Sequence, residues 1–437
     1  MSTVHFITFG CRLNQAETAH AADALQRGGY LISPEADGAD IIVVNGCAVT
    51  GTASQKTRQA LHALRKRHPA ALILLMGCNT VDDRQKAVEG GYADLVLSHS
   101  QANELCALVG QVLQERRAGQ GRGAAPVEGD FKPDTPDDSP HDFTLDGSAR
   151  FAERTRANLK IQDGCSCFCT YCIVPYTRGL PRNRDFEDAL REARELVEAG
   201  YKELVICGVN LMTYSSHGYD LADLLEEILK IGPGFRIRIG SAEPGPQVER
   251  VVAVMKKRPR ICRFLHLPLQ SGDDTILGRM GRSYKAAEYA EMARNASLEV
   301  PGLCLGADVI TGFPGETEEL FANTRRFIDG LPFGLLHIFP YSPRPGTPAA
   351  SFKEKVPHAI AAERATQLIA LGEAKAHSFA TSQLGKCLEI LVEHDGAGWT
   401  DNYLHATLSQ PLPPNTLVTA KITQVNAKRE VVADAGM

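Results

Sequence analysis

The sequence lacks an apolar run long enough to span a bilayer, so no membrane partner is expected. Its first ten residues, MSTVHFITFG, show no charged segment followed by an apolar one, so no secretory signal is expected either. An excess of positive charge is also missing: the formal net charge is -5, although that sum would hide a local basic face. These absences favour a cytoplasmic globular protein whose thiols stay reduced.

Cysteine is plentiful by contrast. In a reducing compartment, twelve cysteines favour metal binding or catalysis over disulfides. The stretch QDGCSCFCTYC places Cys165, Cys167, Cys169 and Cys172 within eight positions. Structural zinc usually takes four ligands from two C-x2-C knuckles or from paired histidines, and only one such knuckle is present, although Cys167 could complete a tetrad. The spacing C-x3-C-x2-C of Cys165, Cys169 and Cys172 instead suits a cubic iron–sulfur cluster with one open iron.

Hydrophobic patterns divide the chain into three domains and a linker. Residues 1–115 alternate short β-branched runs with amphipathic stretches, which predicts an open parallel α/β domain. Residues 116–150 are rich in Gly, Pro and Asp and are expected to form a linker. Residues 151–372 contain six strand–helix units, which predict an α/β barrel or partial barrel with its active site at the carboxyl ends of the strands. Residues 376–437 contain short strands without helices between them, so a small β-barrel is expected.

Three further cysteines follow apolar strands of the first domain. Cys11, Cys47 and Cys78 each come directly after a strand and beside a glycine. In a parallel sheet, residues beyond the carboxyl ends of the strands converge on one crevice. Buried core thiols are the alternative, since free cysteine is often buried. The repeated position favours a shared metal site.

The cysteine loop, with Tyr171 in C-x3-C-x-aromatic-C, resembles the signature of radical S-adenosylmethionine (SAM) enzymes. The similarity narrows to the methylthiotransferase family through IQDGCSCFCTYCIVPYTRG, HLPLQSGDDTILGRMGRSY, GADVITGFPGETEE and FPYSPRPGT, and through GCRLNQAET and VNGCAVT in the first domain. The tail resembles that family's RNA-binding β-barrel, the TRAM domain. The departures are Gly46, where the family usually has Thr, and Gly240, where Ser is common.

This resemblance implies two [4Fe-4S] clusters and SAM as cofactors. Cys165, Cys169 and Cys172 would hold the cluster that cleaves SAM to a 5′-deoxyadenosyl radical, with Cys167 as a bystander. Cys11, Cys47 and Cys78 would hold a second cluster that supplies sulfur. Polar and aromatic residues near the strand ends are expected to bind SAM: Tyr171, Asn210, Ser241, Glu243, Gln270, Arg282 and Asp308. Arg282 suits the SAM carboxylate because its guanidinium is planar.

The resemblance also implies the substrate. The detailed motifs resemble the branch that acts on N6-threonylcarbamoyladenosine at position 37 of tRNA, in the anticodon stem-loop. The alternatives are the isopentenyl-modified adenosine, an aspartate of a ribosomal protein, and a non-catalytic RNA-binding protein with zinc. The threonyl carboxylate needs a cation, and Arg182 or Arg184 is expected to supply it, unless these arginines bind phosphates. An electron donor such as flavodoxin or ferredoxin is expected as a partner, and DNA is not.

Overall fold

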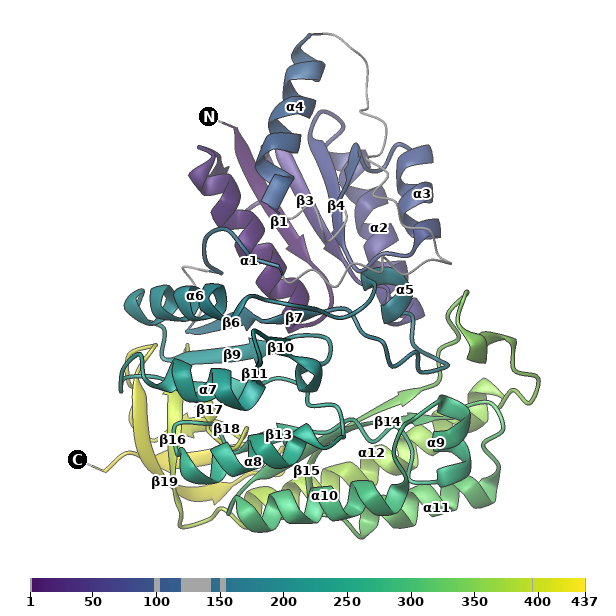
Figure 1. Ribbon diagram of the computed structural model, residues 1–437, viewed down its shortest axis with the longest axis vertical. Coiled ribbons are helices and arrows are strands. Elements are labelled where there is room, and N and C mark those ends of the chain that lie inside the picture. Colours follow the sequence, from purple (N-terminus) through teal and green to yellow (C-terminus); the bar gives the residue numbers. More distant parts are fainter. Residues whose placement is uncertain (1, 98–102, 119–142, 150–154, 395, 437) are drawn as a thin grey trace. The chain divides into compact units, whose positions relative to one another are not determined.

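The computed structural model describes residues 2–97, 103–118, 143–149, 155–394 and 396–436, so most of the predicted linker at 116–150 lies outside the described residues. The chain forms two compact units (Figure 1). The first unit comprises residues 1–151, 158–166 and 172–192, and the second comprises residues 152–157, 167–171 and 193–437.

A parallel five-stranded sheet in the order β2-β1-β3-β4-β5 forms the centre of the first unit. The strands are β1 (Thr3–Thr8), β2 (Leu31–Ile32), β3 (Ile41–Gly46), β4 (Leu72–Gly77) and β5 (Leu95–Val96). The helices are α1 (Arg12–Arg27), α2 (Gly51–Arg67), α3 (Val81–Glu89) and α4 (Leu105–Arg117), and shorter elements are β7 (Gln162–Asp163), α5 (Val174–Arg178) and β8 (Arg182–Asn183). This confirms the open parallel α/β domain that the sequence predicts.

Alternation along the central strands explains the layers of this unit. Val43 packs in the hydrophobic cluster that contains Leu25 of α1 and Val109 of α4. Its neighbour Val44 packs in the opposite cluster, which contains Leu61 of α2. Because consecutive strand residues point to opposite faces, a strand buried on both sides reads as a continuous apolar run. Figure 1 shows α1 and α4 on one face of the sheet and α2 and α3 on the other.

Six parallel strands form a partial barrel, as predicted. They are β6 (Arg156–Lys160), β9 (Glu203–Cys207), β12 (Arg236–Ile239), β13 (Phe264–His266), β14 (Cys304–Thr311) and β15 (Phe333–Pro340). They pair as β12-β9-β6 and β13-β14-β15, and the bridges Ile237–Ile261 and Ser241–His266 continue the curve from β12 to β13. The helices are α6 (Phe186–Glu198), α7 (Leu221–Leu229), α8 (Gln247–Lys257), α9 (Asp274–Met280), α10 (Ala286–Glu299), α11 (Glu318–Asp329) and α12 (His358–Thr381), with the hairpin β10 (Ser215–Ser216) and β11 (Tyr219–Asp220). β6 and α6 contribute residues to both units.

The tail forms a closed β-barrel in the order β16-β17-β18-β20-β19, also as predicted. Its strands are β16 (Cys387–Val392), β17 (Ala397–Thr400), β18 (His405–Leu408), β19 (Leu417–Val425) and β20 (Val431–Asp434). The sequence pattern does not reveal β17, because this strand is only four residues long and contains a glycine. That glycine is required: a Cβ on Gly398 would lie 2.0 Å from the backbone oxygen of Leu391 in β16.

Buried charges join this tail barrel to the amino ends of β9 and β12 within the second unit. The carboxylate of Glu203 accepts hydrogen bonds from Arg236 Nε and Arg238 Nε, each at 2.7 Å. The two guanidinium groups then donate to backbone oxygens of β17 and the turn after it, which belong to Trp399, Thr400 and Asp401. Glu203 and Arg238 are completely buried. The tail barrel therefore completes the polar core of the partial barrel.

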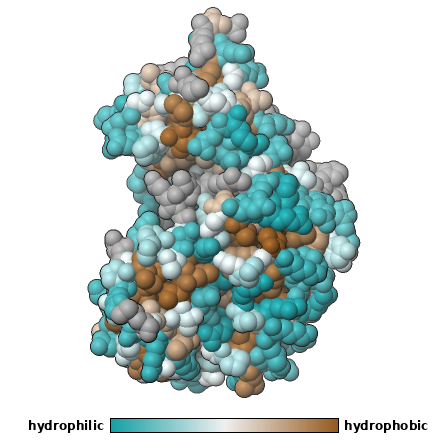
Figure 2. Space-filling model, turned by 90° about the vertical axis from the view of Figure 1, so that its left-hand side faces the viewer, coloured by the Kyte–Doolittle hydropathy of each residue, from teal (hydrophilic) through white to brown (hydrophobic). Residues whose placement is uncertain are grey.

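Figure 2 shows one face of the molecule, which is mostly hydrophilic with separate apolar patches. The large aliphatic side chains of both units are concentrated instead in buried strands and helix faces. Among the helices of the described residues, none is long and apolar enough to cross a membrane.

Candidate active site

Three cysteines meet at the carboxyl edge of the first unit's sheet. Cys47 and Cys78 directly follow β3 and β4, and Cys11 lies three residues after the end of β1. In a sheet of this order, β2 is added on one side of β1 and β3 to β5 are added on the other. The strand order therefore reverses between β1 and β3, and ligands bind at such a switch point. Gly10 makes the approach possible: it has φ +98°, and a Cβ there would lie 3.1 Å from Cys47 Sγ. The structure thus brings the three thiols together, and their role as cluster ligands stays a prediction.

Asn14, on the first turn of α1, organises this site, and the local sequence pattern does not reveal it. Its side-chain amide donates to Asn45 Oδ1 at 3.0 Å and to the backbone oxygen of Gly46 at 2.7 Å. Its Oδ1 accepts from Cys11 Sγ at 3.6 Å and lies 3.9 Å from Cys78 Sγ. Asn14 is fully buried, so it fixes the positions of the strand ends that carry the cysteines.

A buried ionic network lies beside the same thiols. Arg178, the last residue of α5, donates through Nε to Cys78 Sγ at 2.7 Å. Its Nη1 donates to Glu17 Oε1 at 2.7 Å and to Asp163 Oδ1 at 2.9 Å. Lys160 Nζ contacts the same two carboxylates at 2.8 and 2.6 Å. Arg178 therefore links the helix that follows Cys11 to both ends of the cysteine loop at 165–172.

The chemistry of these donors fits a metal cluster. Burial raises the pKa of the Cys78 thiol, Arg178 lowers it, and Cys11, Glu17 and Cys47 raise it again. All twelve cysteines lie in the described part of the chain and none forms a disulfide. Buried thiols that repel one another's negative charge become stable thiolates when a positive centre is shared among them.

Both units contribute to the cysteine loop at 165–172. Cys165 and Cys172 belong to the first unit, whereas Cys167 and Cys169 belong to the second. In the first unit, the backbone N–H of Cys165 donates to the backbone oxygen of Gly179 at 3.1 Å. In the second, Thr170 bonds through its backbone to Met280 at 2.9 Å and to Ala349 at 2.8 Å. These backbone contacts fix Cys165 within the first unit and Thr170 within the second.

An ion pair lies beside Cys169 in the second unit. Arg282 Nη1 donates to Cys169 Sγ at 3.2 Å, and its Nη2 pairs with Glu243. Burial raises the pKa of both Cys169 and Glu243, whereas Arg282 lowers both. Two residues that the sequence assigns to SAM, Glu243 and Arg282, are thus brought together next to a predicted cluster ligand.

The other predicted SAM residues also lie in the second unit. Tyr171 packs edge-on against Phe313, with ring centroids 6.3 Å apart. Asn210 donates to Cys167 Sγ at 3.7 Å. Ser241 bridges to β13, and Gln270 bridges to β14 with a left-handed backbone at φ +65°. Such backbone conformations cost energy for non-glycine residues and cluster at functional sites.

Asp308 belongs to a group of three side chains that the sequence pattern does not reveal. Its carboxylate lies 3.3 Å from His266 Nε2, and a nitrogen of His337 completes a group whose ligand atoms all lie within 4.8 Å of one another. Burial lowers the pKa of His337, while Asp308 raises it. These residues stand on β13, β14 and β15, so only the pairing of the strands brings them together.

The two predicted substrate arginines have different environments. Arg184 is completely buried and pairs with Glu192 and with Asp188, so it is committed within the first unit and is poorly placed to bind a substrate. Arg182 keeps 24% of its side chain exposed and has a longer contact of 3.4 Å with Asp163. Of the two candidates, the structure favours Arg182.

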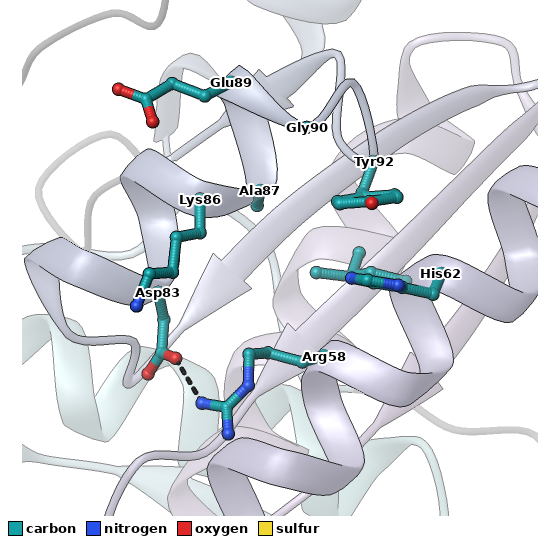
Figure 3. A pocket seen from close by; sticks show the side chains of 9 residues that line it. Arg58, His62, Asp83, Lys86, Ala87, Glu89, Gly90 and Tyr92 are labelled. Carbon is teal, nitrogen blue, oxygen red and sulfur yellow. Dashed lines mark hydrogen bonds and ion pairs between the residues drawn. The ribbon is translucent and has the colours of Figure 1, made fainter.

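Figure 3 shows a separate pocket between α2 and α3. His62 stacks on Tyr92 with ring centroids 3.6 Å apart, and Arg58 donates to Asp83 at 2.7 Å. None of the predicted site residues lines this pocket, so it is not part of the site described above.

The partial barrel and its cysteine loop define a member of the radical SAM superfamily. The model of that superfamily matches residues 159–328, and the model described as "Uncharacterized protein family UPF0004" matches residues 3–98. Among solved structures, the radical SAM methyltransferase TsrM from Kitasatospora setae is similar in fold, with a TM-score of 0.59 at 16% identity over 80% of this chain and 77% of that one.

Curated relatives narrow the assignment. The threonylcarbamoyladenosine tRNA methylthiotransferase MtaB of Bacillus subtilis is 36% identical over 92% of this chain and 90% of its own length. The MtaB of Aquifex aeolicus is 33% identical over 92% of this chain and 95% of its own length. A tRNA-2-methylthio-N(6)-dimethylallyladenosine synthase of Dictyoglomus thermophilum is 34% identical over 82% of this chain and 80% of its own length. The chain belongs to the radical SAM methylthiotransferase family, as its motifs predict.

Proposed function

We propose that this protein converts N6-threonylcarbamoyladenosine at position 37 of tRNA to its 2-methylthio derivative. The observation that carries the proposal is the convergence of Cys11, Cys47 and Cys78 beside Asn14 in a chain that also has the C-x3-C-x2-C loop. Two separate sets of three thiols fit two [4Fe-4S] clusters, each with an open iron. The MtaB relatives support the choice of substrate.

The two clusters and SAM would supply radical formation and sulfur, chemistry that side chains alone do not perform. The residues of the chain would bind and orient these cofactors and the substrate. Glu243 and Arg282 present opposite charges side by side, with side chains 23% and 4% exposed. An amino acid end with an ammonium and a carboxylate group matches such a pair, so these two residues would hold the methionyl end of SAM next to Cys169.

Arg182 would bind the carboxylate of the threonylcarbamoyl group, because a partly desolvated carboxylate needs a cationic partner. Arg182→Ala should weaken binding of the modified tRNA by about 1.5–3 kcal/mol, the range for a hydrogen bond to a charged group. Binding of tRNA without the threonylcarbamoyl group should change much less. A paired titration with both tRNAs measures this, and equal losses would show a phosphate contact instead.

The two-cluster part of the proposal is tested by metal analysis. Protein purified without oxygen should be brown and contain iron with acid-labile sulfide. Replacing Cys11, Cys47 and Cys78 by Ala should remove about half of the iron and stop sulfur insertion, while reductive cleavage of SAM continues. A colourless protein that contains zinc would refute the enzyme and leave the RNA-binding alternative. Methylthiolated product from this variant would refute the sulfur-supplying role.

A second candidate substrate is the isopentenyl-modified adenosine. Relatives named tRNA-2-methylthio-N(6)-dimethylallyladenosine synthase are 33–34% identical over 82–90% of this chain, close to the MtaB values. The isopentenyl group has no carboxylate, so this substrate would make Arg182→Ala neutral in the paired titration.

A further inference from the structure

We propose that Arg178 tunes the cluster held by Cys11, Cys47 and Cys78, by donating a hydrogen bond to the Cys78 thiolate that stabilises the reduced cluster. The inference rests on the proposed function, because it requires that cluster to exist. It concerns a positioning residue, since Arg178 would act through Cys78 and not on the substrate.

The geometry of Arg178 leaves it little freedom. Its side chain is 1% exposed, and Nε points to Cys78 Sγ at 2.7 Å. The opposite edge of the guanidinium is held by both carboxylate oxygens of Glu17, at 2.7 and 3.2 Å, and Nη2 also donates to Asn14 Oδ1 at 3.1 Å. Because the guanidinium group is planar and these acceptors hold its two Nη atoms, its Nε–H stays directed at Cys78 Sγ.

The charges of the network point to an anionic partner. Lys160, Arg178 and Arg182 bring three positive charges to the two carboxylates of Glu17 and Asp163. Most of these groups are buried, where an uncompensated charge is costly. A thiolate at Cys78 supplies a further negative charge at the atom that Arg178 Nε contacts.

An N–H group directed at a cysteine sulfur affects the cluster bound to it. Reduction by one electron adds negative charge to the cluster and its thiolates. Hydrogen bonds to the sulfurs and the local net charge are among the factors that set the reduction potential. The hydrogen bond from Arg178 should therefore raise the potential of this cluster.

The same arginine connects the cluster to the loop that carries the other cysteines. Asp163 lies two residues before Cys165, and Arg178 lies six residues after Cys172. Asp163 accepts hydrogen bonds from Arg178 and from Lys160. Arg178 also donates to Glu17. The side chain that contacts Cys78 Sγ thus also holds Asp163, two residues before Cys165.

The test is a redox titration, followed by electron paramagnetic resonance, of full-length protein in which Cys165, Cys169 and Cys172 are replaced by Ala. Into this background we would introduce Arg178→Gln and Arg178→Lys. We expect Arg178→Gln to shift the oxidised-to-reduced equilibrium at least tenfold toward the oxidised form, which corresponds to about 59 mV for one electron. Arg178→Lys keeps the charge and should shift it less.

Arg65→Gln is the matched control. Arg65 is a partly buried arginine, with 11% of its side chain exposed, and it pairs with Asp94 at 2.5 Å in the same unit. This variant should leave the potential unchanged. If Arg178→Gln does not retain the cluster, the reduction potential of the Arg178→Lys variant is compared with that of the background protein instead. Equal potentials in the background protein and the Arg178 variants that hold the cluster would overturn the inference. Absence of any cluster in the background protein would refute the two-cluster proposal itself, and the inference with it.

Discussion

Glu203→Gln should destabilise the second unit severely, although Glu203 is not among the residues predicted to bind a cofactor. The carboxylate accepts three N–H groups within 3.0 Å from Arg236 and Arg238. Arginines lower the pKa of Glu203, against the effect of burial, so it is ionised at neutral pH. A neutral amide would keep the two buried guanidinium groups beside their backbone acceptors but would remove the negative charge that they share. Removing one partner of a buried ion pair lowers the free energy of unfolding by about 3–5 kcal/mol, and we expect Glu203→Gln to lower it by a similar amount.

The assay is urea unfolding followed by tryptophan fluorescence. The single tryptophan of the chain is Trp399, whose backbone oxygen accepts from Arg236 at 2.9 Å, so its emission reports on this junction. Glu389→Gln is the matched control: Glu389 contacts the same Arg236 at 3.4 Å, but its side chain is 40% exposed. The free energy of unfolding of that variant should fall by no more than about 1 kcal/mol. Equal losses in the two variants would refute the claim that the buried charges anchor the tail barrel.

Three further predictions concern cluster ligands, pH and RNA. Cys167→Ala should keep all of the iron, whereas Cys169→Ala should lose about half of it; loss of a cluster from the Cys167 variant would show that the ligands are misassigned. Burial raises the pKa of Glu192, but His20 and Arg184 lower it to about 2. Because the folded pKa is depressed, Glu192 should contribute about 3 kcal/mol of stability above pH 4.5 that is lost as the pH falls toward 2, and acid unfolding of Glu192→Gln should lack this dependence. Lys421→Glu, on an exposed position of β19, should weaken tRNA binding and reduce the salt slope by about 1, unlike Lys257→Glu on α8; unchanged binding would remove this face from the RNA surface.

The structure predicts two effects of truncating the tail barrel. Removal of residues 376–437 would weaken tRNA binding if the tail barrel binds RNA. It would also expose Glu203, Arg236 and Arg238, which use backbone oxygens of that barrel as partners. The truncated protein should therefore unfold or aggregate, and substitutions on the exposed face of the barrel are the cleaner test of RNA binding.

Features that repeat along the chain could be predicted from the sequence. The buried runs of β3 and β4 identify a parallel sheet, and the position of Cys11, Cys47 and Cys78 after such runs predicts their convergence. The loop with C-x3-C-x2-C is a local spacing, so it is visible without a structure.

Features that depend on distant partners could not be predicted. Asn14 and Arg178 are 164 positions apart, and nothing in either local sequence indicates that they meet. His266, Asp308 and His337 form a group only because three strands lie in register. Arg184 appears in an exposed-looking basic stretch, yet the carboxylates of Glu192 and Asp188 allow it to be buried. A spacing of i and i+3 between Asn14 and Glu17 on α1 was the one available sign of a polar face beside Cys11.

The most direct test of the proposed activity is mass spectrometry of tRNA nucleosides from cells with and without the gene. We expect that 2-methylthio-N6-threonylcarbamoyladenosine disappears without the gene, that its unmethylthiolated precursor accumulates, and that the wild-type gene restores the product. A variant with Cys165, Cys169 and Cys172 replaced by Ala should not restore it. Persistence of this nucleoside without the gene, with loss of the methylthiolated isopentenyladenosine instead, would show that the protein acts on the other modified adenosine.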